Sequence, residues 1–146
     1  MRVLLQRVIK ASVTVEKKEI SSIDAGFLAL VGIEKNDTKQ TVEYLAKKTA
    51  NLRIFEDENG KMNLSILDTN GKILAVSQFT LAGDTANGNR PGFENAAKPE
   101  IAKPMYEYFV ECLRGYGIDV CCGIFQADMQ VSLINDGPVT FMLERK

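Results

Sequence analysis

The 146 residues suffice for one domain, since a domain of about this length buries roughly two thirds of the surface that its unfolded chain exposes. Charged residues make up 25% and the formal net charge is -1, which excludes the global basic field that drives non-specific nucleic-acid binding. No apolar run approaches the roughly 18 residues that span a bilayer, and the start does not form a signal-peptide core. We therefore expect a cytoplasmic protein without a membrane segment.

Residue types that commonly carry metal or nucleophilic chemistry are scarce. The absence of histidine excludes Ser-His-Asp and Cys-His catalysts and histidine-rich metal sites. Cys112, Cys121 and Cys122 lack the paired spacing of a zinc site, and the adjacent two point to opposite faces of an extended segment. We interpret the cysteines as packing residues.

The first part of the sequence predicts three strands. Alternation favours a strand over Arg2–Val15, whose more apolar face consists of Val3, Leu5, Arg7, Ile9, Ala11, Val13 and Val15. A short strand is expected at Ile20–Ile23, and Gly26–Ile33 is apolar on both faces, as in a central strand. Arg7 either reaches water beyond the core edge or lies against a buried polar site.

Two helices are predicted. Asp37 and Gln40 have capping-box spacing at the start of the first, which continues as an apolar stripe to Leu52. The second covers Pro99–Gly115, with Pro104 expected in its first turn, where a missing N–H does least harm.

The remaining patterns predict further strands. After a strand at Leu52–Phe55, the segments Leu64–Leu67 and Lys72–Leu81 flank an Asn-Gly turn and are expected to form an antiparallel hairpin. Later strands are expected at Ile118–Ile124, Gln130–Asn135 and Val139–Glu144, the last two joined by a tight turn that composition alone describes as a hairpin corner. The fold class is therefore α+β: one domain over residues 1–146 with an antiparallel or mixed sheet, curled like a barrel, and two main helices.

The stretch Ser77–Asp84 is the strongest candidate for a functional site. It follows the apolar segment Ile73–Val76, places the polar side chains of Ser77, Gln78 and Thr80 next to Phe79, and runs into an open loop of small residues. A strand that ends in such a loop is a common location for binding and catalysis.

Chemistry at this stretch has to rely on hydroxyls and an amide. A threonine hydroxyl such as that of Thr80 is a weak nucleophile without a base, a lowered pKa or a metal. A catalytic site here would therefore act by positioning and by hydrogen bonds to a developing charge. Alternatively, Ser77 and Thr80 only satisfy backbone groups at the strand end.

Two paired motifs give the sequence a resemblance to a known family. Ser-Gln-Phe-Thr-Leu at Ser77–Leu81 and Asn-Asp-Gly-Pro-Val-Thr at Asn135–Thr140 resemble the D-aminoacyl-tRNA deacylases. Supporting segments run from end to end of the chain: Gln6–Val8, Ala11–Val13, Asn51–Phe55, Gly60–Asn63 and Ala127–Val131.

The resemblance implies a homodimeric editing hydrolase without metal or organic cofactor. It would cleave the ester between a D-amino acid, or mischarged glycine, and the terminal adenosine of tRNA. A cis Gly137–Pro138 bond would enter the partner's active site and reject L side chains. The chemistry would use the 2′-hydroxyl of the tRNA.

The resemblance also implies roles for individual residues. Ser77, Gln78 and Thr80 would handle the scissile ester, with Thr80 in a supporting position, and Phe79 would form a wall for the adenosine. Arg7 would support the Gly-Pro turn. Phe125 and Ala102 would line the same pocket.

The sequence departs from the family pattern at Ala82–Gly83, Ala86–Asn89 and Gly92. The second departure removes basic residues from the loop, which weakens the expected contact with tRNA phosphates. Two other functions stay open: a non-catalytic module that binds RNA ends or nucleotides through Phe79, and an oligomeric scaffold whose loop contacts a protein partner.

Overall fold

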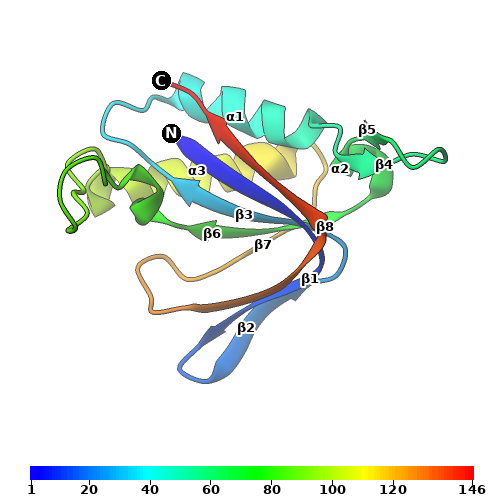
Figure 1. The fold of residues 1–146 in the computed structure, drawn as a ribbon, viewed down its shortest axis with the longest axis horizontal. Helices are drawn as coiled ribbons and strands as arrows, with labels where there is room; N and C mark the ends of the chain where they lie inside the picture. Colours follow the sequence, from blue (N-terminus) through cyan, green and yellow to red (C-terminus); the bar gives the residue numbers. More distant parts are fainter.

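Six strands form one mixed sheet in the computed structural model, which describes all of residues 1–146 (Figure 1). They are β1 (Arg2–Val15), β2 (Lys18–Ile23), β3 (Gly26–Gly32), β6 (Lys72–Ser77), β7 (Val120–Cys122) and β8 (Gln130–Glu144). The order is β2-β1-β3-β6-β7, and β8 pairs with the other side of β1. The sheet bends almost into a barrel, so the predicted α+β class is confirmed.

Apolar residues cover both faces of the central strands. Helices α1 (Lys39–Asn51) and α3 (Pro99–Gly115) lie side by side over one face, where Phe27 and Ile73 join the larger core (Figure 1). The curled ends of β1 and β2 cover Leu28 and Leu74 on the other face. This two-sided burial confirms the prediction of a central strand at residues 26–33.

Strand β1 extends over the predicted residues but changes face along its length. Its pairing with β8 shifts register between Val8 and Lys10. Beyond this bulge, which inverts the alternation, Ala11 is buried while Ile9 is 54% exposed. The prediction that these residues share one face was therefore wrong: Val3 and Leu5 join the larger core cluster, whereas Ala11 and Val13 join the smaller cluster on the opposite face.

Strand β8 is continuous where two strands and a hairpin corner were expected. Both halves pair antiparallel with β1, from Arg2 opposite Glu144 to Thr14 opposite Gln130. Residues 136–139 form an insertion that lies opposite Arg7, between the Gln6–Thr140 and Val8–Asn135 pairs. The turn residues thus make a local bulge in one long strand.

The expected hairpin before β6 is also wrong. Ser65 and Asp68 cap the short helix α2 (Ile66–Thr69) reciprocally, and Asn70 ends it in a left-handed conformation with φ 54°. Strand β6 runs parallel to β3 and β7. The Asn-Gly pair therefore ends a crossover connection between parallel strands rather than forming a hairpin.

Several element ends differ from those expected. Thr38 caps α1 in place of Asp37, whose carboxylate accepts hydrogen bonds from the Glu34 N–H and from the Met1 amino group. Pro104 lies inside α3, beyond the first turn. Between α1 and α2, where a strand was expected at Leu52–Phe55, only β4 (Phe55–Glu56) and β5 (Met62–Leu64) form, as a separate two-stranded sheet.

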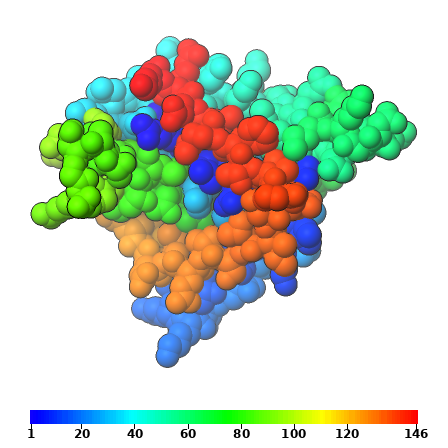
Figure 2. Space-filling view, in the orientation of Figure 1, coloured from blue at the N-terminus to red at the C-terminus, as the bar shows by residue number.

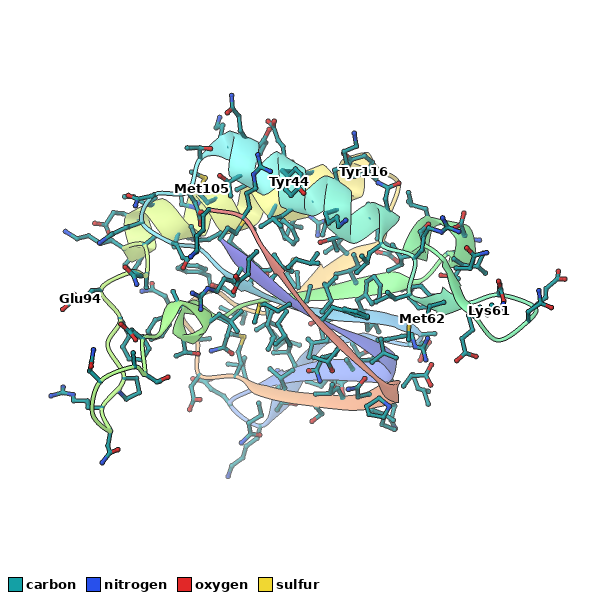
Figure 3. The ribbon with its side chains drawn as sticks, turned by 45° about the horizontal axis from the view of Figure 1, so that its top comes forward. Tyr44, Lys61, Met62, Glu94, Met105 and Tyr116 are labelled. Atoms are coloured by element: carbon teal, nitrogen blue, oxygen red, sulfur yellow. The ribbon has the colours of Figure 1, made fainter.

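The two ends of the molecule carry extended segments. The hairpin of β4 and β5, marked by Lys61 and Met62, projects at one end, and the loop around Glu94 projects at the other (Figure 3). None of the helices has the length and apolarity needed to cross a membrane.

The α2 cap predicts a pH-dependent contribution to stability. The Ser65 backbone N–H and hydroxyl donate to the Asp68 carboxylate and lower its pKa from the usual 3.8. A carboxyl with a lowered folded-state pKa stabilises the protein above its unfolded pKa, and this stabilisation is lost as the pH falls through the folded value. We expect Asp68→Asn to lower the urea midpoint at neutral pH, and the difference from the native protein to shrink below about pH 4.

Urea titrations of both proteins across this pH range measure the effect. Asp24→Asn, at an exposed carboxylate without hydrogen bonds, is the matched control. A difference for Asp68→Asn that does not change with pH would contradict the assignment.

Candidate active site

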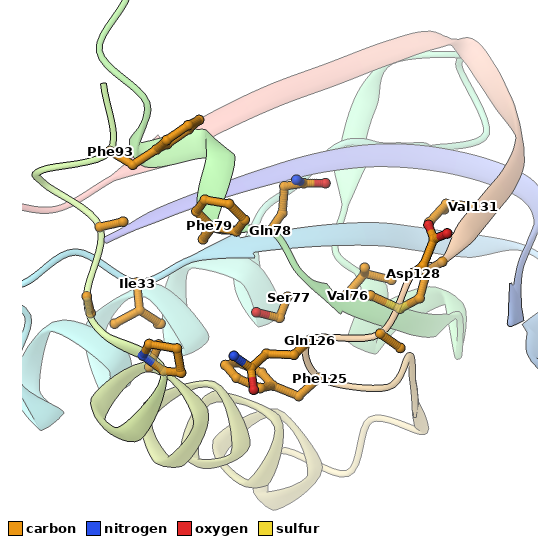
Figure 4. Close-up of a pocket in the computed structure, with 16 residues that line it drawn as sticks. Ile33, Val76, Ser77, Gln78, Phe79, Phe93, Phe125, Gln126, Asp128 and Val131 are labelled. Atoms are coloured by element: carbon orange, nitrogen blue, oxygen red, sulfur yellow. The ribbon is translucent and has the colours of Figure 1, made fainter. Parts of the chain in front are cut away.

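A cavity of about 660 Å³ opens beside the carboxyl end of β6 (Figure 4). Its wall combines the end of β6, the short helix η1 (Phe79–Ala82), the start of α3 and the segment after β7. The 16 residues that line it are Ile33, Val76, Ser77, Gln78, Phe79, Phe93, Ala96, Ala97, Pro99, Ala102, Phe125, Gln126, Ala127, Asp128, Met129 and Val131. The wall is mostly apolar, and its polar side chains come from two places: Ser77 and Gln78 at the end of β6, and Gln126 and Asp128 in the segment after β7.

Five of the predicted site residues line this cavity. Ser77, Gln78 and Phe79 come from one stretch of chain, whereas Ala102 and Phe125 come from α3 and from the segment after β7. Sequence positions as far apart as 77 and 125 therefore meet at one end of the sheet.

Neighbouring strands fix the turn that follows β6. The Gln78 N–H donates to the Val31 carbonyl at 2.8 Å, and the Arg2 side chain donates to the Leu81 carbonyl at 2.8 Å. A Cβ on Gly32 would lie 2.9 Å from the Leu81 Cβ, so only glycine leaves room for η1 to pack against β3. The polar residues are thus held on a defined backbone.

The hydroxyls of Ser77 and Thr80 are in different situations. Ser77 is half-buried on the cavity wall, and its hydroxyl forms no hydrogen bond within the protein. Thr80 is exposed outside the lining, and its hydroxyl accepts a hydrogen bond from the Gln78 amide. No carboxylate or amine contacts either hydroxyl, so neither has a base that would make it a strong nucleophile.

Tyr106 supports the cavity wall from behind. Its hydroxyl donates to the Ala75 carbonyl in β6 at 2.8 Å, and its ring lies 6.1 Å from that of Phe125, centroid to centroid. Burial raises the pKa of the Tyr106 hydroxyl, which keeps it protonated as a donor.

Arg7, Gly137 and Pro138 lie away from this cavity. Arg7 is aligned across the sheet with Ile73, about 13 Å along β6 from Ser77 at the usual rise of a strand. The Gly137–Pro138 bond is cis, as the resemblance implied, and both residues are exposed. The resemblance implied that Gly137 and Pro138 act in the cavity of a partner subunit, and this stays a prediction.

Arg7 is buried against the segment that carries the cis bond. The side chain, 5% exposed, donates to the Asp136 carbonyl at 3.1 Å and to the Ile54 carbonyl at 2.8 Å. The Glu56 and Asp136 carboxylates lie 3.8 and 3.5 Å from it. Of the two interpretations of Arg7, the structure supports a buried polar site, which includes a second cavity of about 200 Å³.

Sequence reasoning missed part of the cavity wall, notably Phe93. Its ring contacts Phe79 at a centroid distance of 5.1 Å. The only available signal was its position after Pro91-Gly92, which indicated a break in regular structure. The supporting segment Ala127–Val131 had no assigned role, although Asp128 and Met129 within it and Gln126 before it line the cavity.

The cysteines pack as predicted. Cys112 and Cys122 pack against the larger core cluster and Cys121 against the smaller one. Burial raises the pKa of the Cys112 and Cys121 thiols and so favours their neutral form. No group of acidic or cysteine side chains is arranged to hold a metal ion.

Comparisons with known proteins agree on one family. The model of the family described as D-Tyr-tRNA(Tyr) deacylase matches residues 4–144. The D-aminoacyl-tRNA deacylase of Exiguobacterium sp. is 57% identical over 145 residues, which are 99% of each chain. That of Thermosipho africanus is 54% identical over 146 residues, 100% of this chain and 98% of the other.

Solved structures show the same fold. One described as c-Myc DNA Unwinding Element Binding Protein has a TM-score of 0.94 and 43% identity, covering 100% of this chain and 99% of the other. A probable eukaryotic D-amino acid tRNA deacylase is similar in fold, with a TM-score of 0.84 at 17% identity over 97% of both chains. Together with the motifs at Ser77–Leu81 and Asn135–Thr140, these matches show that the chain belongs to the D-Tyr-tRNA(Tyr) deacylase family.

Proposed function

We propose that this protein, a carboxylic ester hydrolase of the deacylase family, edits tRNA by releasing D-amino acids and mischarged glycine from the terminal adenosine. The observation that carries the proposal is the cavity at the end of β6, where Ser77, Gln78 and Phe79 of the family motif meet. A cavity of about 660 Å³ lies within the range of small-molecule sites, which suits one aminoacyl-adenosine end.

Different parts of the cavity wall are suited to different parts of the substrate. Phe79 offers an exposed aromatic face to the adenosine, and Phe125 and Ala102 complete an apolar floor. The unbonded Ser77 hydroxyl lies between these apolar parts, and the Gln78 side chain lies beside Phe79 (Figure 4). In our proposal both groups bind the ester. Fixed donors of this kind stabilise the charge that develops on the ester oxygen in the transition state.

The chemistry depends on the substrate for its reactive hydroxyl. The protein has no histidine, and the one carboxylate on the cavity wall, that of Asp128, forms no hydrogen bond with Ser77 or Thr80. In our proposal the 2′-hydroxyl of the terminal adenosine assists the attack of water on the ester. The protein contributes orientation, which can account for a large part of a rate enhancement. The hydrogen bond from Gln78 gives Thr80 a supporting role.

Selection against L-amino acids is assigned to Gly137 and Pro138 of a second subunit. Both residues are exposed on β8 and lie far from their own cavity, so a partner copy has to bring them to the site. Their carbonyls would hold the substrate amino group and leave no room for an L side chain. Arg7 supports the segment from behind through its hydrogen bond to Asp136.

The edge of the sheet supports a homodimer. Strand β8 pairs only with β1, and its other edge has no strand partner. Its residues, orange to red in Figure 2, lie uncovered on one face of the molecule. Ile134, Phe141 and Met142 on β8 are 45%, 39% and 43% exposed. An unpaired strand edge with exposed apolar side chains favours pairing with another chain. In our proposal a second copy of this protein covers the edge.

Cleavage of D-tyrosyl-tRNA and L-tyrosyl-tRNA tests the proposed activity. We expect release of the D-amino acid and negligible release of the L-amino acid, because the filter excludes the L side chain. Acid precipitation of labelled aminoacyl-tRNA measures both rates. Equal cleavage of the two substrates contradicts the proposal, and tight binding without turnover would favour the RNA-end binding module.

Thr80→Ala is expected to retain activity within about tenfold of the native protein, since the hydroxyl acts through positioning. A substrate with a 2′-deoxy terminal adenosine is expected to lose most of its turnover while it still binds. Single-turnover rates separate these effects from product release. Complete loss in Thr80→Ala with intact binding, together with rapid cleavage of the deoxy substrate, would assign the attack to Thr80.

Mixing two inactive variants tests whether the filter comes from the partner. Ser77→Phe obstructs the cavity, and Gly137→Ala displaces the filter because a Cβ there would lie 2.7 Å from the Val139 side chain and 3.1 Å from Arg7, at a φ of +132°. After denaturation and refolding together, random pairing should restore about a quarter of native activity, because half of the dimers contain one intact composite site. A mixture as inactive as its components would place both elements of a site on one chain.

A further inference from the structure

Two exposed aromatic rings form a corner at one end of the cavity. Phe79 is 54% exposed and Phe93 is 40% exposed, although both line the cavity wall. Their centroids lie 5.1 Å apart and their planes meet at 60° (Figure 4). Each ring therefore keeps one face or edge open to a ligand.

The backbone holds Phe93 in place although it follows a long loop. Asp84 and Gly92 exchange two hydrogen bonds of 2.8 Å, which close the loop at its base. Beyond Phe93, the Lys35 N–H donates to Asn95 at 3.0 Å and the Ala97 N–H donates to Ile33 at 3.0 Å. These bonds position the ring before any ligand binds, which lowers the entropic cost of binding.

Gly83 provides the space that the ring occupies. A Cβ on Gly83 would lie 3.2 Å from the Phe93 Cε1 atom, closer than most side-chain contacts. The Phe93 ring therefore packs directly on the backbone of the turn that carries Phe79. This close approach sets the angle between the two rings.

The chemistry of the corner selects a flat, neutral ligand group. Its neighbours on the wall include Ile33, Ala96 and Pro99, and none of these is charged. A phosphate or an ammonium group would lose its hydration here without a partner, whereas a nucleobase gains stacking on either ring. The polar residues Ser77 and Gln78 begin where the corner ends.

We propose that Phe93 forms, with Phe79, an angled stacking site for the base of the terminal adenosine. The assignment rests on the proposed function, because it takes the aminoacylated end of tRNA as the ligand. The site recognises the base by its aromatic face. Phe93 is a binding residue and takes no part in the bond cleavage.

Binding is tested with an acceptor-stem minihelix whose terminal base is 2-aminopurine and whose D-tyrosyl group is linked through a non-hydrolysable amide. We expect stacking to quench the fluorescence in the native protein and in Phe93→Tyr, and the quenching to be lost in Phe93→Leu. Tyr116→Leu is the matched control, since this aromatic residue is 42% exposed near the far end of α3 (Figure 3). Because the ligand is not cleaved, the signal reports on the corner whether or not the protein is a deacylase.

Kinetics with D-tyrosyl minihelices separate a loss of base stacking, which raises KM, from a general loss of folded or active protein, which lowers kcat. Phe93→Leu is expected to raise KM about tenfold with kcat within about twofold, as for the loss of one stacked base. On a minihelix whose terminal nucleotide lacks a base, Phe93→Leu and the native protein should have the same KM.

Three results would overturn the proposal: full quenching in Phe93→Leu, an unchanged KM for that variant, or equal affinity of the native protein for minihelices with and without the terminal base. The last comparison uses no variant and stands even if Phe93→Leu folds poorly.

Discussion

The burial of β6 on both faces is the constraint on which the arrangement of the molecule depends. Residues Ile73–Val76 pair with β3 and β7 and are covered by helices on one side and by the curled sheet on the other. Polar groups with unmet hydrogen-bonding capacity are costly in such surroundings. After these buried residues, the next position in β6 that can carry a polar side chain without this cost is Ser77, where the strand reaches the cavity.

The same constraint explains how much of the site could be predicted. The change from Ile73–Val76 to Ser77 and Gln78 marks the end of a buried strand in any fold, so this half of the wall was accessible from the sequence. Phe93 was not, because its position depends on hydrogen bonds to residues 33–35 that no local pattern indicates. The helix at Pro99–Gly115 was predicted to the residue because its stripe is long and periodic.

The errors in the fold have a common physical origin. The Asn-Gly pair after Asp68 and the Asp-Gly-Pro segment of β8 both have turn composition, and each was assigned a hairpin. The pairing partner is decided by tertiary contacts: β6 is drawn into a parallel arrangement with β3, and both halves of β8 remain on β1. Composition specifies local dihedral angles, but it does not determine whether the chain reverses or continues.

The insertion in β8 links selection against L-amino acids to the formation of a dimer. The residues proposed to exclude L-amino acids lie on the same strand as the open sheet edge, and their own cavity lies at the other end of the sheet. On this arrangement an isolated subunit has a cavity for the substrate but lacks the carbonyls that hold its amino group, so it would be neither active nor selective. Activity and stereochemical selectivity would then both require the dimer, and their dependence on protein concentration would follow the association equilibrium.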